Sequence, residues 1–489
     1  MSSLSKRGFA VLKTDKNAKE IAVLKKKLTV KPVGMSFIQS AVVEEDTSFP
    51  CYLESSKKLY MPKCFGLSEF GIPDKDTICN GAAIHVPFKG SIRGNQVEPI
   101  ADFMKAANNP LERGGILCMY PGFGKTVCAL NLVSQLGVKT LIVVHKEFLM
   151  QQWRERIEQY LPGAKVGVIQ GSKMISDGCD IVLAMLQSLS MKDYPENTFD
   201  EFGFLIVDEC HHIGAEVFSR ALHKTNFRYS LGLSATPVRK DGLTKVIKWF
   251  IGDVIHKSKK REDIVQVRAM EYKSDDRAYC QEYTLYNKPC VTKMINAICR
   301  FEPRTEFIID CIFDIKGRDV DRFILVLSDR REHLTNMCKS IASRASMRGD
   351  GTGTGTSRMK VGFYVGGMKQ SELDNTSETA DIILATYSMA AEAMDIPKLN
   401  TLVLASPKGD VEQSIGRIQR QKPEDRVYEP TVIDIVDRFS SFNNQWKKRS
   451  AFYKKHKYNV EYKSMEVEEI DFIQSKIRGF AIVTDNCDK

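Results

Sequence analysis

The sequence predicts an α/β protein with two tandem domains, each a parallel sheet with helices on both faces, preceded by a small α+β module. Strand-length apolar runs alternate with helix-length segments in two blocks, which begin near Ile92 and near Arg322. Such alternation is typical of βαβ units, whose strands run parallel and are buried on both faces. The pattern before Gly90 differs, because a Lys-rich helical stretch is followed by short β-like runs.

The domain boundaries follow from these changes of pattern. We predict an N-terminal accessory module at 1–90, a first α/β domain at 91–255, a bridging segment at 256–305, a second α/β domain at 306–460 and a C-terminal tail at 461–489. The expected strands are 115–119, 140–144, 180–184 and 204–207 in the first domain, and 323–327, 360–364, 382–385 and 401–404 in the second. The Gly- and Thr-rich stretch 349–357 is expected to form a flexible surface loop.

Composition excludes several classes of protein. Of the 489 residues, 43% are hydrophobic and 27% are charged, which is ordinary for a soluble globular chain. The 13 cysteines are scattered without a CxxC pair, and no signal peptide or membrane-length apolar run occurs. We therefore expect a soluble intracellular protein with reduced thiols, without a disulfide framework or a membrane span. The net charge of +10 permits nucleic-acid binding only if basic residues cluster locally.

A glycine loop between an expected strand and an expected helix predicts a phosphate-binding site. Backbone N–H groups of such a loop surround phosphates at a helix N-terminus, while the Lys reaches the β- and γ-phosphates and the Thr hydroxyl binds Mg²⁺. The leading residue departs from the usual small Gly or Ala. The loop residues are Met119, Tyr120, Pro121, Gly122, Phe123, Gly124, Lys125 and Thr126.

Two adjacent carboxylates follow the apolar run 204–207. Asp208, at the C-terminal end of a central strand, can hold Mg²⁺ opposite Thr126, and Glu209 can orient or deprotonate a water molecule. The alternative is an acidic surface pair. A metal site at His211 and His212 is the weaker interpretation, because adjacent side chains point apart on a regular backbone.

Two further segments accompany the glycine loop and the carboxylates as candidate parts of one site. The small residues Ser234, Ala235 and Thr236 follow another apolar strand and can couple the carboxylates to a neighbouring domain, although the same residues are typical of a Pro-containing turn. Gln413, Arg417 and Arg420 are spaced to share one face of a helix. Arginines aimed at a γ-phosphate accelerate phosphoryl transfer by roughly 10³–10⁵. The alternative for the arginines is a solvated basic face.

The order of these motifs resembles the superfamily 2 helicases, which have two RecA-like domains with a P-loop NTPase fold and bind ATP and Mg²⁺ between them. Asp208-Glu209-Cys210-His211 corresponds to the DExH box. The run from Ser234 to Gly242 is similar to the excision-repair group B, UvsW and type III restriction-like branch. The front segment and the tail resemble helicases of large cytoplasmic DNA viruses. A viral origin would imply a location at host-cell replication sites and in the virion.

The resemblance also implies roles for residues outside the glycine loop. Gln96 would read adenine, and Asp395 would contact ATP. Ala393 stands where the family usually has Gly, which puts the neighbouring nucleic-acid contact in doubt. The residues expected to hold a nucleic-acid backbone are His145, Lys146, Gly171, Ser172, Gln187, Ser188, Gly366 and Thr386.

A basic and aromatic segment near the C-terminus has two interpretations. Lys447, Lys448, Lys454 and Lys455 accompany aromatic residues such as Trp446. This mixture suits single-stranded nucleic acid, because cations meet phosphates and rings stack on bases. The segment can equally be a packing helix whose lysines remain in water.

The sequence thus favours a nucleic-acid-dependent ATPase, a DNA helicase or translocase with the 3′-to-5′ direction that the family implies. DNA is the favoured partner over RNA, and the replication or transcription machinery is a candidate partner. Alternatives are a transcription-associated translocase that releases transcripts, an RNA helicase, and an ATP-gated nucleic-acid-binding switch that performs no unwinding. The sequence leaves the oligomeric state open.

Overall fold

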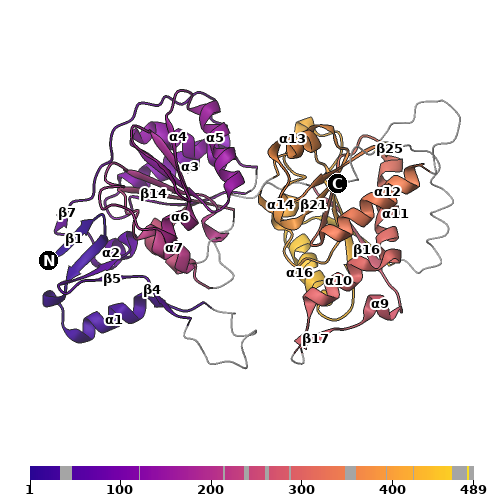
Figure 1. The fold of residues 1–489 in the computed structure, drawn as a ribbon, viewed down its shortest axis with the longest axis horizontal. Coiled ribbons are helices and arrows are strands. Elements are labelled where there is room, and N and C mark those ends of the chain that lie inside the picture. The colour runs from indigo at the N-terminus through magenta and orange to yellow at the C-terminus, as the bar shows by residue number, and fades with distance from the viewer. Residues whose placement is uncertain are drawn as a thin grey trace. The chain divides into compact units, whose positions relative to one another are not determined.

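The computed structural model of the chain describes residues 1–32, 47–120, 122–212, 215–235, 242–258, 264–285, 288–346, 359–392, 394–421, 423–464 and 482–483. The chain divides into two compact units, Met1–Lys260 and Arg261–Lys489 (Figure 1). Both units contain an extended, mainly parallel sheet, so the predicted fold class is confirmed. The expected loop 349–357, Pro121, Thr236 and Ala393 lie outside the described residues.

A five-stranded sheet forms the core of the N-terminal module. Helix α1 (Ala18–Leu28) begins with a capping box between Asn17 and Glu20 and buries Leu24 and Leu28. The strands, in sheet order, are β5 (Leu53–Glu54), β6 (Lys58–Met61), β2 (Gly8–Leu12), β1 (Ser2–Ser5) and β7 (Lys75–Asp76). A separate two-stranded pair joins β3 (Thr29–Val30) and β4 (Phe49–Pro50).

A buried lysine attaches this module to the rest of unit 1. Lys63 begins helix α2 (Lys63–Phe70), which packs on α8 (Thr244–Ile251). Its Nζ donates to the carbonyls of Phe227 (2.9 Å) and Arg228 (3.1 Å) and to Ser230 Oγ (3.2 Å). Burial lowers the pKa of Lys63 to about 8. The carbonyl oxygens satisfy an ammonium group that would otherwise be costly to bury.

An eight-stranded sheet runs through the remainder of unit 1. Neighbouring strands are parallel, apart from the β10–β11 pair. The order is β11 (Lys173–Ile175), β10 (Val166–Gln170), β12 (Ile181–Met185), β9 (Thr140–Val144), β13 (Phe204–Val207), β14 (Tyr229–Ser234), β8 (Gly114–Cys118) and β15 (Val254–Lys257).

The central strands divide their side chains between two cores. In β9, Leu141 and Val143 face one core while Ile142 and Val144 face the other. Helices α3 (Gly94–Asn108), α4 (Lys125–Leu136) and α5 (Glu147–Tyr160) cover one face, and α6 (Leu186–Met191), α7 (Ala215–Leu222) and α8 cover the other. Burial on both faces explains why these strands are continuous apolar runs.

The sheet of unit 2 also has eight strands, and each neighbouring pair is parallel. The order is β24 (Asn459–Ser464), β16 (Gln266–Tyr272), β23 (Thr431–Asp437), β22 (Thr401–Leu404), β19 (Ile324–Ser328), β21 (Ile382–Thr386), β20 (Met359–Tyr364) and β25 (Ile482–Val483). The helices include α9 (Arg277–Cys280), α10 (Val291–Arg300), α11 (Glu302–Arg318), α12 (Arg331–Ser346), α13 (Gln370–Thr379), α14 (Tyr387–Glu392), α15 (Glu412–Ile415) and α16 (Phe442–Lys455). A short hairpin pairs β17 (Thr284–Leu285) with β18 (Lys288–Pro289).

The interval 256–305, expected to bridge the domains, instead contributes an inner strand to unit 2. Strand β16 pairs with β23 over its whole length and with β24 on its other side. Its side chains alternate between buried and partly exposed positions, so the strand lacks the continuous apolar character of its neighbours. Residues 461–464 likewise belong to β24 rather than to a separate tail.

A charged cluster lies inside the core of unit 2. Arg304 of α11 donates from Nε and Nη2 to the two carboxylate oxygens of Asp437, each at 2.7 Å, and from Nη1 to the carbonyl of Ala405 at 2.8 Å. The hydroxyl of Tyr279 donates to the same carboxylate at 2.9 Å. Both charged side chains are 0% exposed. The paired geometry supplies the compensation that buried charges require.

Among the described residues, no helix is both long and apolar enough to cross a membrane.

Candidate nucleotide-binding site

The glycine loop connects β8 to α4 with the geometry expected of a phosphate cradle. Gly122 (φ 84°) and Gly124 (φ 95°) adopt left-handed conformations that favour glycine. A Cβ on Gly124 would lie 2.3 Å from Gln96 Nε2, so a larger residue would clash there. Met119, the departure from the usual loop pattern, is buried in the core. Its side chain therefore does not fill the loop.

Gln96 holds the loop through its side-chain amide. Its Nε2 donates to the carbonyls of Phe123 (3.1 Å) and Gly124 (3.4 Å), and its Oε1 accepts from the backbone N–H of Arg93 (2.9 Å). The residue is 1% exposed. Both ends of the amide thus bind backbone, which joins the start of α3 to the loop. The adenine-reading role implied by the resemblance stays a prediction.

The two carboxylates after β13 lie beside the loop lysine. Lys125 Nζ is 2.6 Å from Glu209 Oε1. Glu209 has a φ of 43°, so the chain turns sharply after the strand. Burial, followed by repulsion from Glu209, raises the pKa of Asp208 to about 6, while Lys125 and a hydrogen bond from Trp153 act in the opposite direction.

The oxygen donors at this position fit Mg²⁺. Asp208 Oδ1 accepts from the N–H of Glu209 at 2.9 Å and Oδ2 accepts from Trp153 Nε1 at 2.8 Å. Each carboxylate oxygen has two lone pairs, so each can still bind a cation. Thr126 stands in the first turn of α4, where its hydroxyl is a second hard donor. Carboxylate and hydroxyl oxygens, together with substrate phosphates, are typical Mg²⁺ ligands.

A histidine links the carboxylates to the end of β14. Ser234 Oγ and His211 Nδ1 are 2.9 Å apart, and the same ring nitrogen is 3.4 Å from Glu209 Oε2. The carbonyl of Ala235 accepts from Cys118 Sγ at 3.5 Å. Ser234 was predicted to act in coupling, whereas His211 was weighed as a metal ligand and as the last residue of the DExH box, without a coupling role. The sequence did contain a signal for this contact. The acidic motif and Ser234 each follow or end a predicted strand, and such strands can be neighbours in a parallel sheet.

The residues expected to contact nucleic acid in unit 1 lie at the carboxyl ends of three neighbouring strands of its sheet. They follow β9, β10 and β12, which are neighbours in the order β10-β12-β9. Gln187 Nε2 donates to the carbonyl of His145 at 3.0 Å, and Ser188 Oγ accepts from the N–H of Gly171 at 2.9 Å. Ser172 is exposed beside Gly171, and Lys146 immediately precedes α5. The structure therefore brings together three segments that are distant in sequence.

Unit 2 contains the remaining expected contacts. Thr386 ends β21, with its hydroxyl 3.3 Å from Ser388 Oγ. Gly366 follows the adjacent strand β20, and its carbonyl accepts a hydrogen bond from Arg331. These two positions therefore lie at the carboxyl ends of two neighbouring parallel strands of the second sheet.

The sequence predicted that Arg417 and Arg420 share one face of a helix, but in the structure neither lies in a helix. Helix α15, which contains Gln413, ends at Ile415, and the following turn carries Arg417. Arg417 Nη1 donates to the carbonyl of Met394 at 2.7 Å, while Arg420 forms an ion pair with Asp395. Both arginines therefore lie beyond the end of the helix, and the buried Arg417 contacts a neighbouring segment. The catalytic roles of Gln413 and both arginines, and the ATP contact of Asp395, stay predictions.

The basic and aromatic segment forms helix α16, which has one buried face and one face of exposed lysines. Arg449 Nε is 2.8 Å from Asp434 Oδ2, and the hydroxyl of Tyr453 donates to the same oxygen at 2.7 Å. Phe442 is buried with them, whereas Trp446 is partly exposed. The exposed lysines are Lys447, Lys448, Lys454 and Lys455. The helix therefore packs on the sheet and still presents its lysines to solvent.

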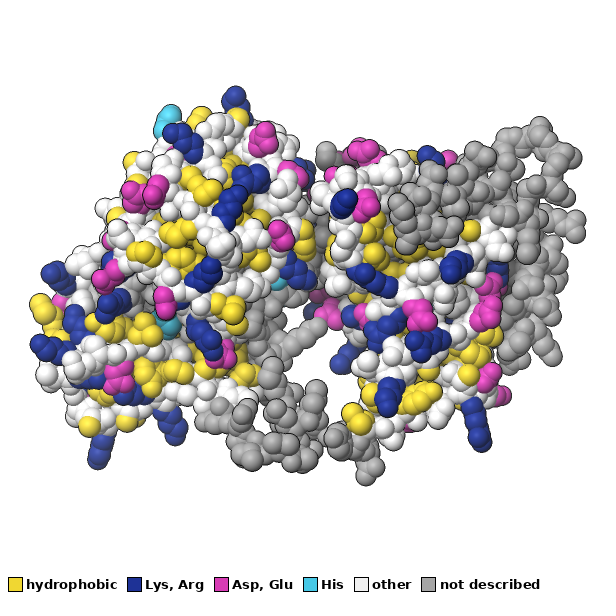
Figure 2. Space-filling model, in the orientation of Figure 1, with side chains coloured by type: hydrophobic (Ala, Val, Ile, Leu, Met, Phe, Trp, Pro, Cys, Tyr) yellow, Lys and Arg dark blue, Asp and Glu magenta, His cyan; other side chains and the backbone are white. Residues whose placement is uncertain are grey.

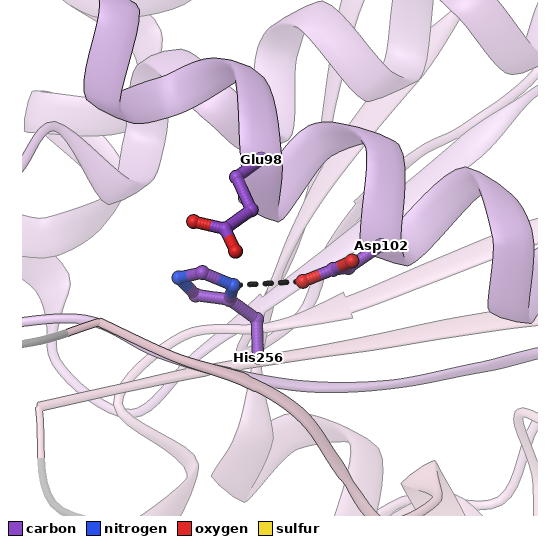
Figure 3. Close-up of side chains that lie close together, drawn as sticks. All are labelled: Glu98, Asp102 and His256. Atoms are coloured by element: carbon purple, nitrogen blue, oxygen red, sulfur yellow. Dashed lines mark hydrogen bonds and ion pairs between the residues drawn. The ribbon is translucent and has the colours of Figure 1, made fainter.

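A second group of polar side chains joins α3 to β15 (Figure 3). Within the described residues, Glu98, Asp102 and His256 are the one group of three potential metal ligands whose donor atoms lie within 4.8 Å of one another. His256 Nδ1 is 2.8 Å from Asp102 Oδ2, and Glu98 is exposed. The hydrogen bond satisfies the ring nitrogen without an ion. We interpret the group as a link between the helix and the edge strand.

Comparison with known sequences gives two kinds of match. The family described as type III restriction enzyme, res subunit, matches residues 89–239. A protein of Acanthamoeba polyphaga mimivirus, named as a candidate ATP-dependent RNA helicase, is 32% identical over 469 residues, covering 94% of this chain and 86% of that protein. A candidate helicase of Invertebrate iridescent virus 6 is 26% identical over 386 residues, covering 76% of this chain and 83% of that protein.

Among solved structures, a variant of S. cerevisiae Dbp5 bound to RNA and ADP BeF3 resembles this chain with a TM-score of 0.50. The alignment covers 79% of this chain and 98% of Dbp5 at 12% identity. At that identity the likeness concerns the fold, which agrees with the two sheets described above.

Proposed function

Since the chain belongs to the superfamily 2 helicases, ATP-hydrolysing enzymes that act on nucleic acid, we propose that it is a DNA helicase or translocase that moves 3′ to 5′. The observation that carries the catalytic part of this proposal is the cluster of Lys125, Asp208 and Glu209 beside the glycine loop. The direction of movement and the preference for DNA rest on the resemblance of the sequence motifs.

The residues of unit 1 have distinct proposed tasks. The loop amides and Lys125 bind phosphate oxygens, Thr126 and Asp208 hold Mg²⁺, and Glu209 positions a water molecule and accepts its proton. Bound Mg²⁺ would neutralise phosphate charge as the bond to the leaving group breaks. The ion pair of Lys125 with Glu209 means that the lysine must exchange this partner for phosphate when ATP binds. The exchange frees the carboxylate to act on water.

The residues of unit 2 are proposed to act on the same nucleotide. Gln413, Arg417 and Arg420 belong to the motif that supplies arginine fingers in the family. Arg420 is held by Asp395, and Arg417 by the carbonyl of Met394. These contacts describe how both side chains are held within unit 2.

Arg420→Ala is expected to lower nucleic-acid-stimulated ATP turnover by roughly 10³-fold or more, with ATP affinity changed less than tenfold. An arginine finger stabilises charge that develops in the transition state, so its loss affects kcat more than ground-state binding. The measurement is steady-state ATPase activity combined with equilibrium binding of an ATP analogue.

The matched control for Arg420 is Arg318→Ala, which removes an exposed arginine of unit 2 paired with Asp314. This control should retain wild-type turnover. Arg420 would be a structural residue if its loss changed the melting temperature and left kcat of the folded protein intact.

The proposed nucleic-acid surface depends on local contacts rather than on a uniform charge. On the face shown in Figure 2, Lys and Arg side chains are interspersed with acidic and hydrophobic ones. The hydroxyls of the exposed Ser172 and the partly exposed Thr386 suit contacts to phosphates, and such contacts carry no sequence information. The exposed lysines of α16 offer a second set of phosphate contacts.

Replacing Lys447, Lys448, Lys454 and Lys455 with Gln is expected to weaken single-stranded DNA binding and to flatten its salt dependence. If all four contact phosphates, the slope of log affinity against log salt should decrease in magnitude by about 2.8, from roughly 0.7 per contact. Stability should change little, because the four side chains are exposed. Binding titrations from roughly 50 to 200 mM salt measure this slope in the variant and in the wild-type chain.

The control for this variant removes the same charge elsewhere on unit 2, by replacing the exposed Lys273, Lys293, Lys339 and Lys463 with Gln. An equal loss of slope in both variants would indicate a general effect of net charge, and an unchanged slope in the α16 variant would leave packing as the role of the helix.

RNA is the second candidate substrate, because the mimivirus relative is named as a candidate ATP-dependent RNA helicase. ATPase stimulation by single-stranded DNA, duplex DNA and RNA at one salt concentration decides the substrate. Strand displacement with 3′ and 5′ overhangs then decides direction. Turnover without displacement would favour a translocase that releases transcripts, and nucleotide-controlled binding without turnover would favour an ATP-gated switch.

A further inference from the structure

We propose that Trp153 is a positioning residue for Asp208 and connects this carboxylate to the helix that begins at the expected nucleic-acid contacts. The inference rests on the proposed function, in which Asp208 holds Mg²⁺ and Lys146 lies at the nucleic-acid face. It adds an α5 residue that neither the sequence motifs nor the comparisons assign to the site.

The contact between Trp153 and Asp208 is direct and buried. The indole Nε1 donates to Asp208 Oδ2 at 2.8 Å. Trp153 is 2% exposed and Asp208 is 8% exposed, so water does not compete freely for the hydrogen bond. An indole N–H is a donor only, and a buried donor needs an acceptor. The contact is therefore a directed interaction between this ring and this carboxylate.

Two donors together fix the orientation of the carboxylate. The N–H of Glu209 binds Oδ1 at 2.9 Å while Trp153 binds Oδ2. The first donor belongs to the acidic motif itself, and the second comes from α5. Without the indole N–H, the carboxyl group can rotate about its terminal torsion, whose preference is intrinsically broad. Cation-binding lone pairs would then lose their fixed direction.

Helix α5 extends from the nucleic-acid face to the carboxylate. It begins at Glu147, directly after Lys146, and Trp153 stands less than two turns along, at about 9 Å from its start. Leu149, Met150 and Ile157 pack in the same core as Trp153, so the helix is held along its length. If a bound nucleic-acid strand displaced the start of α5, the helix would move Trp153 as well and so change its hydrogen bond to Asp208.

The first test is Trp153→Phe, which keeps an aromatic ring and removes the donor. We expect the Mg²⁺ concentration needed for half-maximal binding of a fluorescent ATP analogue to rise on the order of tenfold, since a hydrogen bond to a charged group is lost. The metal-free binding of the analogue should change less than twofold. Trp249→Phe, in α8 against Phe65, is the matched control and should leave the Mg²⁺ requirement at the wild-type value.

A second measurement uses the intrinsic fluorescence of the ring itself. The chain has three tryptophans, so replacing Trp249 and Trp446 with Phe leaves Trp153 as the sole tryptophan, whose emission is followed by excitation at a wavelength that tyrosine does not absorb. We expect its emission to shift when Mg²⁺ and the ATP analogue are added together, and to shift when single-stranded nucleic acid is added alone. This readout does not require Trp153→Phe to fold.

The outcomes separate this inference from the proposed function. A Mg²⁺ requirement within twofold of wild type in Trp153→Phe, or an emission that responds to neither addition, overturns the positioning role even if the enzyme hydrolyses ATP. Should Trp153→Phe not fold, the emission of the sole-tryptophan protein decides alone. Absence of nucleotide binding by the wild-type chain overturns the proposed function and this inference together.

Discussion

Glu209→Gln is expected to reduce ATP turnover by at least about 10²-fold while nucleotide binding persists. Removing a general base typically costs 10²–10⁴-fold in rate, and the amide preserves the size and shape of the side chain. The variant also loses the ion pair with Lys125, which stands at 2.6 Å in this structure. A lysine released from the carboxylate is available to phosphate, so the affinity for ATP should stay equal or rise.

Single-turnover hydrolysis and equilibrium binding of ATP test this prediction. Lys125→Ala provides the contrast, because it removes the phosphate contact and should lower both binding and turnover. Glu216→Gln, an exposed carboxylate of α7 paired with Arg220, is the control and should behave as wild type. Nucleic-acid-stimulated turnover near the wild-type rate in Glu209→Gln would exclude the role of this carboxylate as a base.

Asp437→Ala is expected to lower the free energy of unfolding of unit 2 by about 3–5 kcal/mol. Removing one partner of a buried ion pair leaves the other charge uncompensated, which is the costly case. Here the remaining group would be the guanidinium of Arg304, which is fully buried in the core of unit 2. The hydroxyl of Tyr279 would lose its acceptor at the same time.

Urea unfolding, followed by hydrogen exchange of peptides from unit 2, measures this loss. Asp314→Ala is the matched control, because the partly exposed Asp314 pairs with Arg318 and Arg268 in contact with solvent, and its removal should cost less than about 1 kcal/mol. Replacing both partners, with Arg304→Met and Asp437→Leu, should recover much of the stability, since no charge is then left buried. A loss equal to that of the control would mean that the pair contributes little.

The sequence contained the information for most of the fold. Strands β9, β13 and β19 are buried along their whole length because both faces of their sheets are covered, and their nearly continuous apolar sequences are visible without coordinates. The order of the glycine loop, Asp208-Glu209 and the arginine motif likewise indicated the family. Strand β16 was missed because its buried and partly exposed side chains alternate, so its place between β23 and β24 depends on pairing with distant strands.

Local sequence determined which residues are proposed to carry the chemistry: the glycines that permit positive φ, the lysine at the helix start, and the two carboxylates at a strand end. Tertiary structure alone decided their partners. Arg417 lies in a turn and donates to the carbonyl of Met394, a contact that helical spacing does not reveal. The contact of Trp153 with Asp208 joins residues 55 positions apart. Residue spacing predicts neighbours within one helix or strand, whereas contacts between elements depend on how the sheets and helices pack.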